Sequence, residues 1–466
     1  MSKRLKILIV GNDPHIIGGV QNYTRPLAKT FAQIGHHIHY FYSGVSTDSY
    51  NWFFKPYLRF NRKDFPFECA ELVNSPNWKI NFNDLSNDIH NRKTERIFEK
   101  YINRIRPDIM HVHSRHGLPA SIIDIAAQNG IKAFNTIHIY GMLCPKRVMV
   151  DKEGNICNGP FDLMKCTSCC VEPSYNRAKL RARLASVHPH LPKQLFKIKN
   201  VIRGKKDRPR TTGKSPLMPE VDEKKLNALR FRLKNMIDLM NRRVTQNICV
   251  STDVKNTLHR FGVQEDKLLV QHIGSVIAEF QKSDFHALHT PLVIGNIGGV
   301  AHYKGTQVLL DAVHQVKNKD FVVKIFGKYD PKYRDDIMRG KEELPVEFVG
   351  RYETGELSSI LKQIDIMVLP SICKDTAPQT IFESFSARIP IIASDIGGFP
   401  DFIQDDRNGR LFRAGDSRDL AEKIDDILLD PEKINAFARN IPRLKTIKEN
   451  ADELIDLYVQ SFKMNE

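Results

Sequence analysis

The chain has 466 residues, of which 41% are hydrophobic and 27% are charged, as in an ordinary globular protein. Its net charge is +16, and no apolar run approaches the roughly 20 residues that a membrane-spanning helix needs. These values exclude an integral membrane protein, and the length predicts two or three domains. The start, MSKRLKILIVGND, has too short an apolar run for a signal peptide, so we expect a cytoplasmic protein with reduced cysteines.

The first half of the chain alternates between short apolar runs and amphipathic stretches. Such alternation predicts a parallel sheet covered by helices on both faces. Helices are expected at residues 20–35 and 117–130. The strands are expected at KILIVG (6–11), HHIHYFYSG (36–44), PDIMHVHS (107–114) and IKAFNTIH (131–138).

Five of the eight cysteines fall within 27 consecutive positions, in a Cys-rich loop at residues 144–170. Cys166 and Cys169 have the spacing of a metal knuckle, and Cys144 and Cys157 could complete a tetrahedral set. We therefore expect a structural zinc ion that holds this loop. Buried thiols or a redox pair are the alternatives.

A basic segment then interrupts the alternation. Between Tyr175 and Val244 the chain has 20 Lys and Arg against 5 Asp and Glu, and we expect a basic insertion at about residues 175–220. Its mixture of cations and apolar residues favours peripheral contact with an anionic membrane, and a solvated loop is the alternative. It has few aromatic residues and no finger spacing, so we expect no nucleic-acid partner.

The alternation restarts after the basic segment and is broken again near residues 275–290. The last segment, IKENADELIDLYVQSF, has apolar residues at helical spacing. We expect an N-terminal domain at 1–275, a C-terminal domain at 288–445 and a final helix in 446–466. The strands of the second half are expected at 247–251, 267–274, 291–298, 321–327, 346–350, 364–371 and 390–394.

The stretch DTAPQTIFES places two acids, Asp375 and Glu383, eight residues apart. The apolar run before it predicts a buried strand, and Pro378 suits the first turn of a helix. Asp375 is then expected in the loop above the carboxyl end of the strand, the edge at which open α/β sheets bind ligands. The alternative is a helix-capping acid followed by a surface glutamate.

Several motifs in order give the chain a family resemblance. GGVQNYTRPLAKTFAQIGHHIHYF, then HYKG, then DTAPQTIFES resemble the retaining, nucleotide-sugar-dependent glycosyltransferases of the GT-B fold, family 4, also called glycosyl transferases group 1. The resemblance implies an α/β protein with two Rossmann-like domains facing across a cleft. It also implies that the C-terminal domain binds the donor and that the final helix crosses back to the N-terminal domain.

The resemblance assigns donor-binding roles to the region around the two acids. Glu383 would bind the ribose hydroxyls, and a carboxylate can accept hydrogen bonds from both of them. Asp375 would lie near the hydroxyls of the donor sugar, although it is one methylene shorter than the usual glutamate. The N–H groups around Gln379 and Thr380, which follow Pro378, would hold the pyrophosphate at a helix N-terminus.

Other donor roles come from the same resemblance. Lys304 in HYKG would neutralise charge on the leaving diphosphate. The family often has an arginine where this chain has Gly299, and Lys374 is a candidate substitute for that cation. Arg351 and Tyr352 occupy the position where the backbone contacts the base.

The remaining roles fall on the N-terminal half. Gly18 and Gly19 would form a loop that lets phosphate approach closely. On the acceptor side, His113 and His138 end two adjacent strands, and His138 could hydrogen-bond the sugar or orient the acceptor hydroxyl. Chance placement is the alternative for any one of the 17 histidines.

Together these features predict the transfer of a hexosyl group from a nucleotide-diphosphate sugar to a glycan or lipid-linked acceptor. His138, Lys304, Asp375 and Glu383 would be the catalytic residues. Retention of configuration and a place in cell-surface polysaccharide synthesis are implied by the resemblance. The sequence has no Asp-x-Asp motif, so we expect no catalytic metal. The alternatives are a GT-B sugar-nucleotide epimerase and a non-catalytic basic binding protein.

Overall fold

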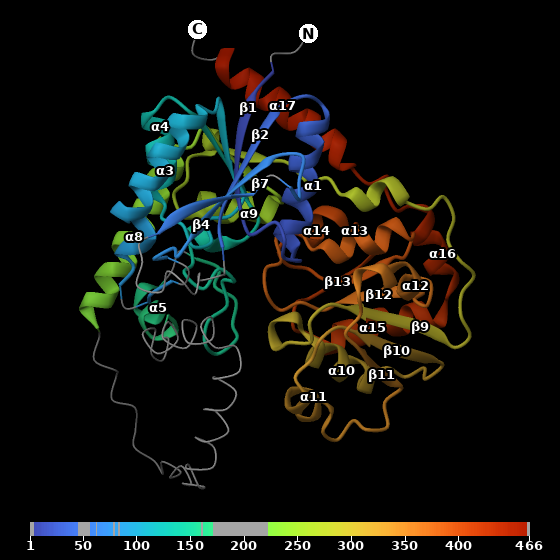
Figure 1. Ribbon diagram of the computed structural model, residues 1–466. Coiled ribbons are helices and arrows are strands. Elements are labelled where there is room, and N and C mark those ends of the chain that lie inside the picture. The colour runs from blue at the N-terminus through green and yellow to red at the C-terminus, as the bar shows by residue number, and fades with distance from the viewer. Residues whose placement is uncertain are drawn as a thin grey trace, which may run out of the picture. The chain divides into compact units, whose positions relative to one another are not determined.

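The expected alternation of strands and helices is confirmed by a computed structural model of the chain (Figure 1). It contains an eight-stranded sheet in the order β3-β4-β2-β1-β5-β6-β7-β8 and a six-stranded sheet in the order β11-β10-β9-β12-β13-β14. The structure describes residues 4–44, 56–61, 63–77, 80–82, 84–159, 162–170 and 222–463.

The larger sheet is parallel except at one edge. β1 pairs in parallel with β2 and β5, and only β3 runs antiparallel to its neighbour β4 among the pairings recorded for this sheet in the described ranges. Central strands such as β1 are almost fully buried, which explains their continuous apolar runs. The strands are β1 (Lys6–Gly11), β2 (His37–Ser43), β3 (Tyr57–Asn61), β4 (Glu68–Val73), β5 (Ile109–Val112), β6 (Lys132–Ile137), β7 (Gln246–Cys249) and β8 (Leu268–Val270).

The smaller sheet is parallel throughout. β9 and β12 are neighbours at its centre, so the loops that follow these two strands leave the same edge of the sheet. The strands are β9 (Leu292–Ile297), β10 (Phe321–Phe326), β11 (Val346–Gly350), β12 (Ile366–Leu369), β13 (Ile391–Ser394) and β14 (Gly409–Phe412).

Helices connect the strands and cover the sheets. Those of the first part of the chain are α1 (Gly19–Gln33), α2 (Ser86–Ile89), α3 (Arg92–Ile105), α4 (Ser121–Gln128), α5 (Leu163–Cys169), α8 (Glu223–Arg242) and α9 (Thr252–Arg260). Those that follow are α10 (Thr306–Gln315), α11 (Pro331–Met338), α12 (Leu357–Leu361), α13 (Gln379–Ser386), α14 (Phe399–Phe402), α15 (Ser417–Leu429), α16 (Glu432–Arg439) and α17 (Ile447–Lys463).

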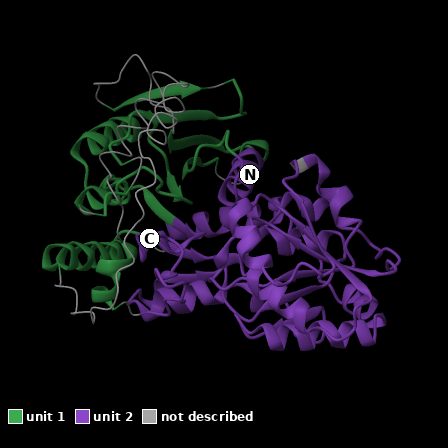
Figure 2. Cartoon of the chain, turned by 90° about the horizontal axis from the view of Figure 1, so that it is seen from below, with its two compact units in different colours: residues 1–16, 32–134, 161–245 green, residues 17–31, 135–160, 246–466 purple. Residues whose placement is uncertain are grey.

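The chain forms two compact units, which Figure 2 shows in different colours. Unit 1 contains residues 1–16, 32–134 and 161–245, and unit 2 contains residues 17–31, 135–160 and 246–466. This grouping reflects how compactly the residues pack and does not test the domain bounds expected from the sequence, which stay a prediction.

Each unit has its own apolar core. In unit 1, α3 and α4 pack on β1, β2 and β5 through buried residues such as Phe98, Ile122 and Val10. In unit 2, α10, α15 and α16 pack on one face of the six-stranded sheet, where Leu309 and Val323 are fully buried. Burial of this apolar surface holds the strand ends in place, and these ends carry the candidate site.

The expected C-terminal amphipathic helix is present as α17 and packs on α1 within unit 2. Asn450 in α17 accepts a hydrogen bond from the Tyr23 hydroxyl at 2.7 Å through Oδ1. The rings of Phe31 and Tyr458 lie 6.1 Å apart between centroids, and Tyr458 is fully buried. The helix therefore joins residues from the two ends of the chain.

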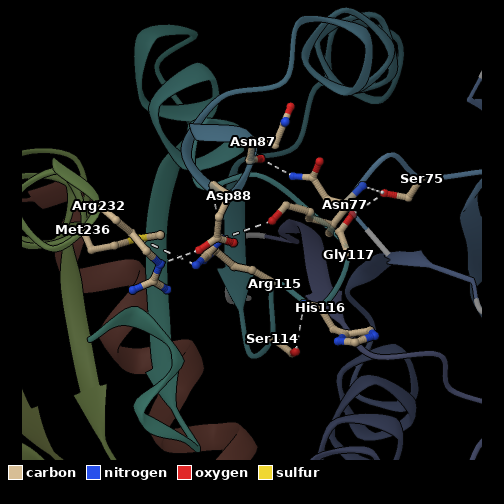
Figure 3. Close-up of polar contacts among 11 residues, drawn as sticks. Ser75, Asn77, Asn87, Asp88, Ser114, Arg115, His116, Gly117, Arg232 and Met236 are labelled. Atoms are coloured by element: carbon tan, nitrogen blue, oxygen red, sulfur yellow. Dashed lines mark hydrogen bonds and ion pairs between the residues drawn. The ribbon is translucent and has the colours of Figure 1, made fainter. Parts of the chain in front are cut away.

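Unit 1 contains a buried cluster of one acid and two arginines (Figure 3). Arg232 of α8 donates from Nε to Oδ2 of Asp88 at 2.7 Å, and Nη1 of Arg115 lies 3.4 Å from Oδ1. Burial opposes ionisation of Asp88, but the two guanidinium groups outweigh it and hold the pKa of Asp88 below its usual value. The cluster ties α8 to α2 and to the loop after β5.

We expect Asp88→Asn to destabilise unit 1 by about 3–5 kcal/mol, because the substitution removes the carboxylate charge that faces two buried guanidinium groups. The lowered pKa means that the carboxylate stabilises the fold above the usual aspartate pKa and that this stability is lost as the pH falls through the lower, folded-state pKa. Urea denaturation at pH 7 and in acid measures the effect. The control is Glu99→Gln on the exposed face of α3, and equal stability of Asp88→Asn and this control at pH 7 would contradict the prediction.

Candidate functional site

Unit 2 contains a cavity with a volume of about 390 Å³. All of its lining residues belong to unit 2, and most come from the start of α1, the segment after β6, the ends of β9 and β12 with the loops that follow them, and the start of α13. The lining brings together several of the predicted site residues. These are Gly19, His138, Lys304, Asp375, Pro378, Gln379 and Thr380.

An ion pair lies at the centre of this lining. The Lys304 ammonium is 2.8 Å from both carboxylate oxygens of Asp375, and the Ser371 hydroxyl donates to Oδ2 at 2.6 Å. Burial alone would lower the pKa of Lys304, but the adjacent Asp375 carboxylate outweighs it and raises that pKa. The lysine is therefore a fixed cation at neutral pH.

A glycine allows the lysine loop to approach β12. Lys304 ends a short 3₁₀ turn, His302–Lys304, and is followed by Gly305, whose φ is +74°. A Cβ atom at residue 305 would collide with the carbonyl oxygen of Pro370 at the end of β12. Glycine therefore meets both a conformational and a steric requirement here.

The start of α13 faces the same cavity. Pro378 is its N-cap residue and has no side-chain capping bond, and Gln379 and Thr380 begin the helix. The first N–H groups of a helix have no partner inside that helix, and its dipole adds partial positive charge there. Among the described residues, no hydrogen bond is recorded for the N–H of Gln379 or Thr380. This end of the helix can receive an anion.

Glu383 lies one turn further along α13 and does not line the cavity. Burial raises the pKa of its carboxyl group to about 7. The pKa of Tyr352 is raised to about 12, first by burial and then by the charge of Glu383, so these two predicted residues are near each other. No hydrogen bond reaches the Glu383 carboxylate from the residues that the structure describes.

His138 lines the cavity as a neutral imidazole. Burial lowers its pKa to about 3, and its side chain packs 5.1 Å from the ring of Tyr23 between centroids. Its carbonyl oxygen accepts a hydrogen bond from the Thr376 hydroxyl at 2.6 Å, which joins the segment after β6 to the loop after β12. A neutral histidine can donate or accept a hydrogen bond but supplies no charge.

Gly18, Arg351 and His113 lie outside the lining, whereas Gly299 is part of it and has open space where a Cβ would stand. Arg351 is exposed beside Glu353. His113 is buried in unit 1, where its ring packs against that of His111.

Lys374 does not replace the missing cation at the cavity. Its side chain is 5% exposed, and its ammonium lies 2.6 Å from Oδ1 of Asp253 in α9. The Tyr140 hydroxyl donates to the other oxygen of Asp253 at 2.6 Å. Asp253, Tyr140 and Ser371 were not predicted from the sequence, and only Ser371 had a signal, since it is the last residue of the predicted strand 364–371.

The cysteines of the Cys-rich loop belong to both units. Cys144 and Cys157 lie in unit 2, whereas Cys166 and Cys169 lie on α5 in unit 1. The zinc site stays a prediction. In the described part of the chain, none of the helices combines the length and apolar content needed to cross a membrane.

Comparison with solved structures defines the class of fold. HepE from Anabaena, in complex with UDP, matches with a TM-score of 0.62 and 13% identity, over 98% of this chain and 100% of HepE. The chain therefore has the GT-B fold.

Comparison of sequences is more specific. Residues 278–444 match the family model described as glycosyl transferases group 1. The chain is 25% identical over 176 residues to the amylovoran biosynthesis glycosyltransferase AmsK of Erwinia amylovora, covering 36% of this chain and 43% of AmsK. It is 30% identical over 145 residues to the sulfoquinovosyl transferase SQD2 of Arabidopsis thaliana, covering 30% of this chain and 27% of SQD2. The matches thus span less than half the length of these relatives.

Glu383→Gln should stabilise the unliganded protein at pH 8. Burial raises the pKa of Glu383 to about 7 in the folded state, so the unfolded chain loses this proton first and the wild type loses stability as the pH rises towards 7. Glutamine carries no charge, and we expect a gain of roughly 1–3 kcal/mol at pH 8 and little at pH 4.

Thermal denaturation at the two pH values measures this difference. Glu343→Gln, at an exposed position, is the matched control and should change stability little at either pH. A stability gain for Glu383→Gln that is the same at pH 4 and pH 8 would show that the carboxyl group is not the cause.

Proposed function

We propose that the chain is a glycosyltransferase that moves a hexosyl group from a nucleotide-diphosphate sugar to a glycan or lipid-linked acceptor. The observation that carries this proposal is the cavity of unit 2, where the Lys304–Asp375 pair and the start of α13 face the same space. The family match over residues 278–444 and the names of AmsK and SQD2 support it. The complex of HepE with UDP supports a nucleoside diphosphate as the leaving group.

The donor would be held by charge and by backbone donors. Lys304 would neutralise the diphosphate, and the N–H groups of Gln379 and Thr380 would bind its oxygens. Glu383 would accept hydrogen bonds from the ribose hydroxyls, and Tyr352, beside it, would lie near the base. Asp375 would orient both the lysine and a hydroxyl of the donor sugar. These groups would supply the positive charge that a bound metal ion supplies in metal-dependent enzymes, so we propose no catalytic metal.

The proposed reaction retains the configuration of the sugar. The acceptor oxygen would form a bond to the anomeric carbon on the face from which the diphosphate leaves. The bond between that carbon and the phosphate oxygen breaks, and the acceptor proton passes to the leaving phosphate oxygen. His138 is neutral and would hydrogen-bond the sugar or the acceptor hydroxyl without taking part in charge neutralisation.

Calorimetry with nucleoside diphosphates tests the donor site. Glu383→Ala should weaken binding by roughly 1.5–3 kcal/mol, the contribution of a hydrogen bond to a charged group. Glu343→Ala, at an exposed position, should bind like the wild type. Unchanged affinity of Glu383→Ala for every nucleoside diphosphate would remove this residue from the donor site.

The reaction class is tested by following nucleotide release from nucleotide sugars. Release that requires an added acceptor, and a product linkage of the same configuration as the donor, are expected. Release without any acceptor would instead favour an epimerase or a hydrolase.

We also propose that the protein works on the cytoplasmic face of the membrane in cell-surface polysaccharide synthesis. AmsK is named for the biosynthesis of amylovoran, which supports the pathway class. The membrane contact would come from the basic insertion at about 175–220, which lies outside the described residues.

Co-sedimentation with liposomes tests this contact. Each Lys or Arg near an anionic surface contributes about 1 kcal/mol, so binding should rise with anionic lipid and fall with salt. Neutralising Lys197, Lys199, Arg203, Lys205 and Lys206 should weaken this binding. Equal binding to neutral and anionic liposomes would contradict the proposal.

A structural zinc ion at Cys144, Cys157, Cys166 and Cys169 remains part of the proposal. Cobalt substitution would report it through a thiolate-to-cobalt charge-transfer band. Absence of this band from the cobalt-treated protein would show that the four cysteines do not form a metal site.

A further inference from the structure

A second group of ligand-type side chains lies in unit 2 outside the lining of the donor cavity. His286 and His289 are three positions apart in the segment that precedes β9, and Asp365 directly precedes β12. β9 and β12 are neighbouring parallel strands, so the start of each lies at the same edge. This edge is opposite the one that carries Lys304 and Asp375, because those residues follow the same two strands.

The three side chains converge on one point. Nδ1 of His289 lies 2.8 Å from Oδ1 of Asp365, and Nε2 of His286 lies 3.3 Å from the same oxygen. All three ligand atoms lie within 4.8 Å of one another. Zinc bonds of about 2.0–2.2 Å at tetrahedral angles separate two ligand atoms by about 3.3–3.6 Å, so little movement is needed to bind a metal ion.

The negative charge of the Asp365 carboxylate also favours binding of a cation. The Asp365 side chain is fully buried, and no lysine or arginine pairs with it among the described residues. A buried carboxylate is costly unless it is paired or bound to a metal. Two imidazoles and one carboxylate suit zinc and similar divalent transition metals better than calcium or magnesium, which prefer oxygen ligands.

The surroundings orient the carboxylate and leave space beside it. The backbone N–H of Val293 donates to Oδ2 of Asp365 at 2.7 Å, and that of His289 donates to Oδ1 at 3.2 Å. Such outer contacts are typical of metal ligands. His289 also lines a cavity of about 230 Å³ together with Asn318 and Asp320, which gives room for water as a fourth ligand.

We propose that His286, His289 and Asp365 form a binding site for a zinc-class divalent metal ion. The ion fastens the segment that enters the C-terminal sheet to the amino ends of β9 and β12. The competing interpretation is that histidine–aspartate hydrogen bonds hold the segment without metal.

Metal binding by the full-length chain separates the two interpretations. Titration with Co²⁺ should give visible d–d bands, and elemental analysis after equilibration with Zn²⁺ should find the ion. His286→Gln should weaken Zn²⁺ binding at this site by more than about 100-fold, beyond the ~10–100-fold that loss of an outer-shell partner causes. Zn²⁺ should raise the melting temperature of the wild type more than that of this variant.

Two further variants keep the test decisive. His314→Gln, on the exposed face of α10, should bind metal like the wild type. His286→Cys should retain metal and add a thiolate-to-cobalt charge-transfer band, which also distinguishes this site from one made of cysteines. Equal metal content and equal Co²⁺ spectra in the wild type, His286→Gln and His286→Cys would overturn the proposal, whatever the result for sugar transfer.

Discussion

The ion pair between Lys304 and Asp375 is the interaction around which the candidate site is built. The two residues are 71 positions apart, yet the Lys304 ammonium lies 2.8 Å from both oxygens of Asp375. They meet because β9 and β12 are adjacent parallel strands whose loops leave the same edge of the sheet. The pair keeps the lysine charged in a partly buried place, where burial alone would favour the neutral amine. A cation that is already in place needs no reorganisation when an anionic ligand arrives.

The main cause of the pKa shift differs among three ionisable groups of the candidate site. Lys304 has a carboxylate beside it, and its pKa is raised. Burial lowers the pKa of His138 to about 3, so its imidazole stays neutral. Glu383 is also shifted by burial, to a pKa of about 7, so a modest change in its surroundings moves it between charged and neutral forms. A bound diol could supply that change, because hydrogen bonds to a carboxylate favour its ionised form.

The sequence predicts those features of the site that depend on local pattern. Apolar runs followed by polar loops predict the strands, and Lys304 and Asp375 could be placed at strand ends on this basis. The base-contact position at Arg351 rests on the resemblance instead and stays a prediction; β11 is an edge strand, and the arginine side chain is exposed beside Glu353. Reasoning from local pattern misses Asp253, whose partner Lys374 is 121 residues away. Pairing over such a distance depends on how helices pack, which no short pattern contains.

Opposite charges on consecutive residues fix the register of the loop after β12. The buried Lys374 points to Asp253, and Asp375 points to Lys304 at the cavity. A slip of one residue would bring a carboxylate towards Asp253 or a lysine towards Lys304, and unpaired or like charges in partly buried positions cost several kcal/mol. The Thr376 hydroxyl adds a third connection, to the carbonyl oxygen of His138. The loop is thus held by partners from three separate elements, so Asp375 keeps one orientation even though it is shorter than a glutamate.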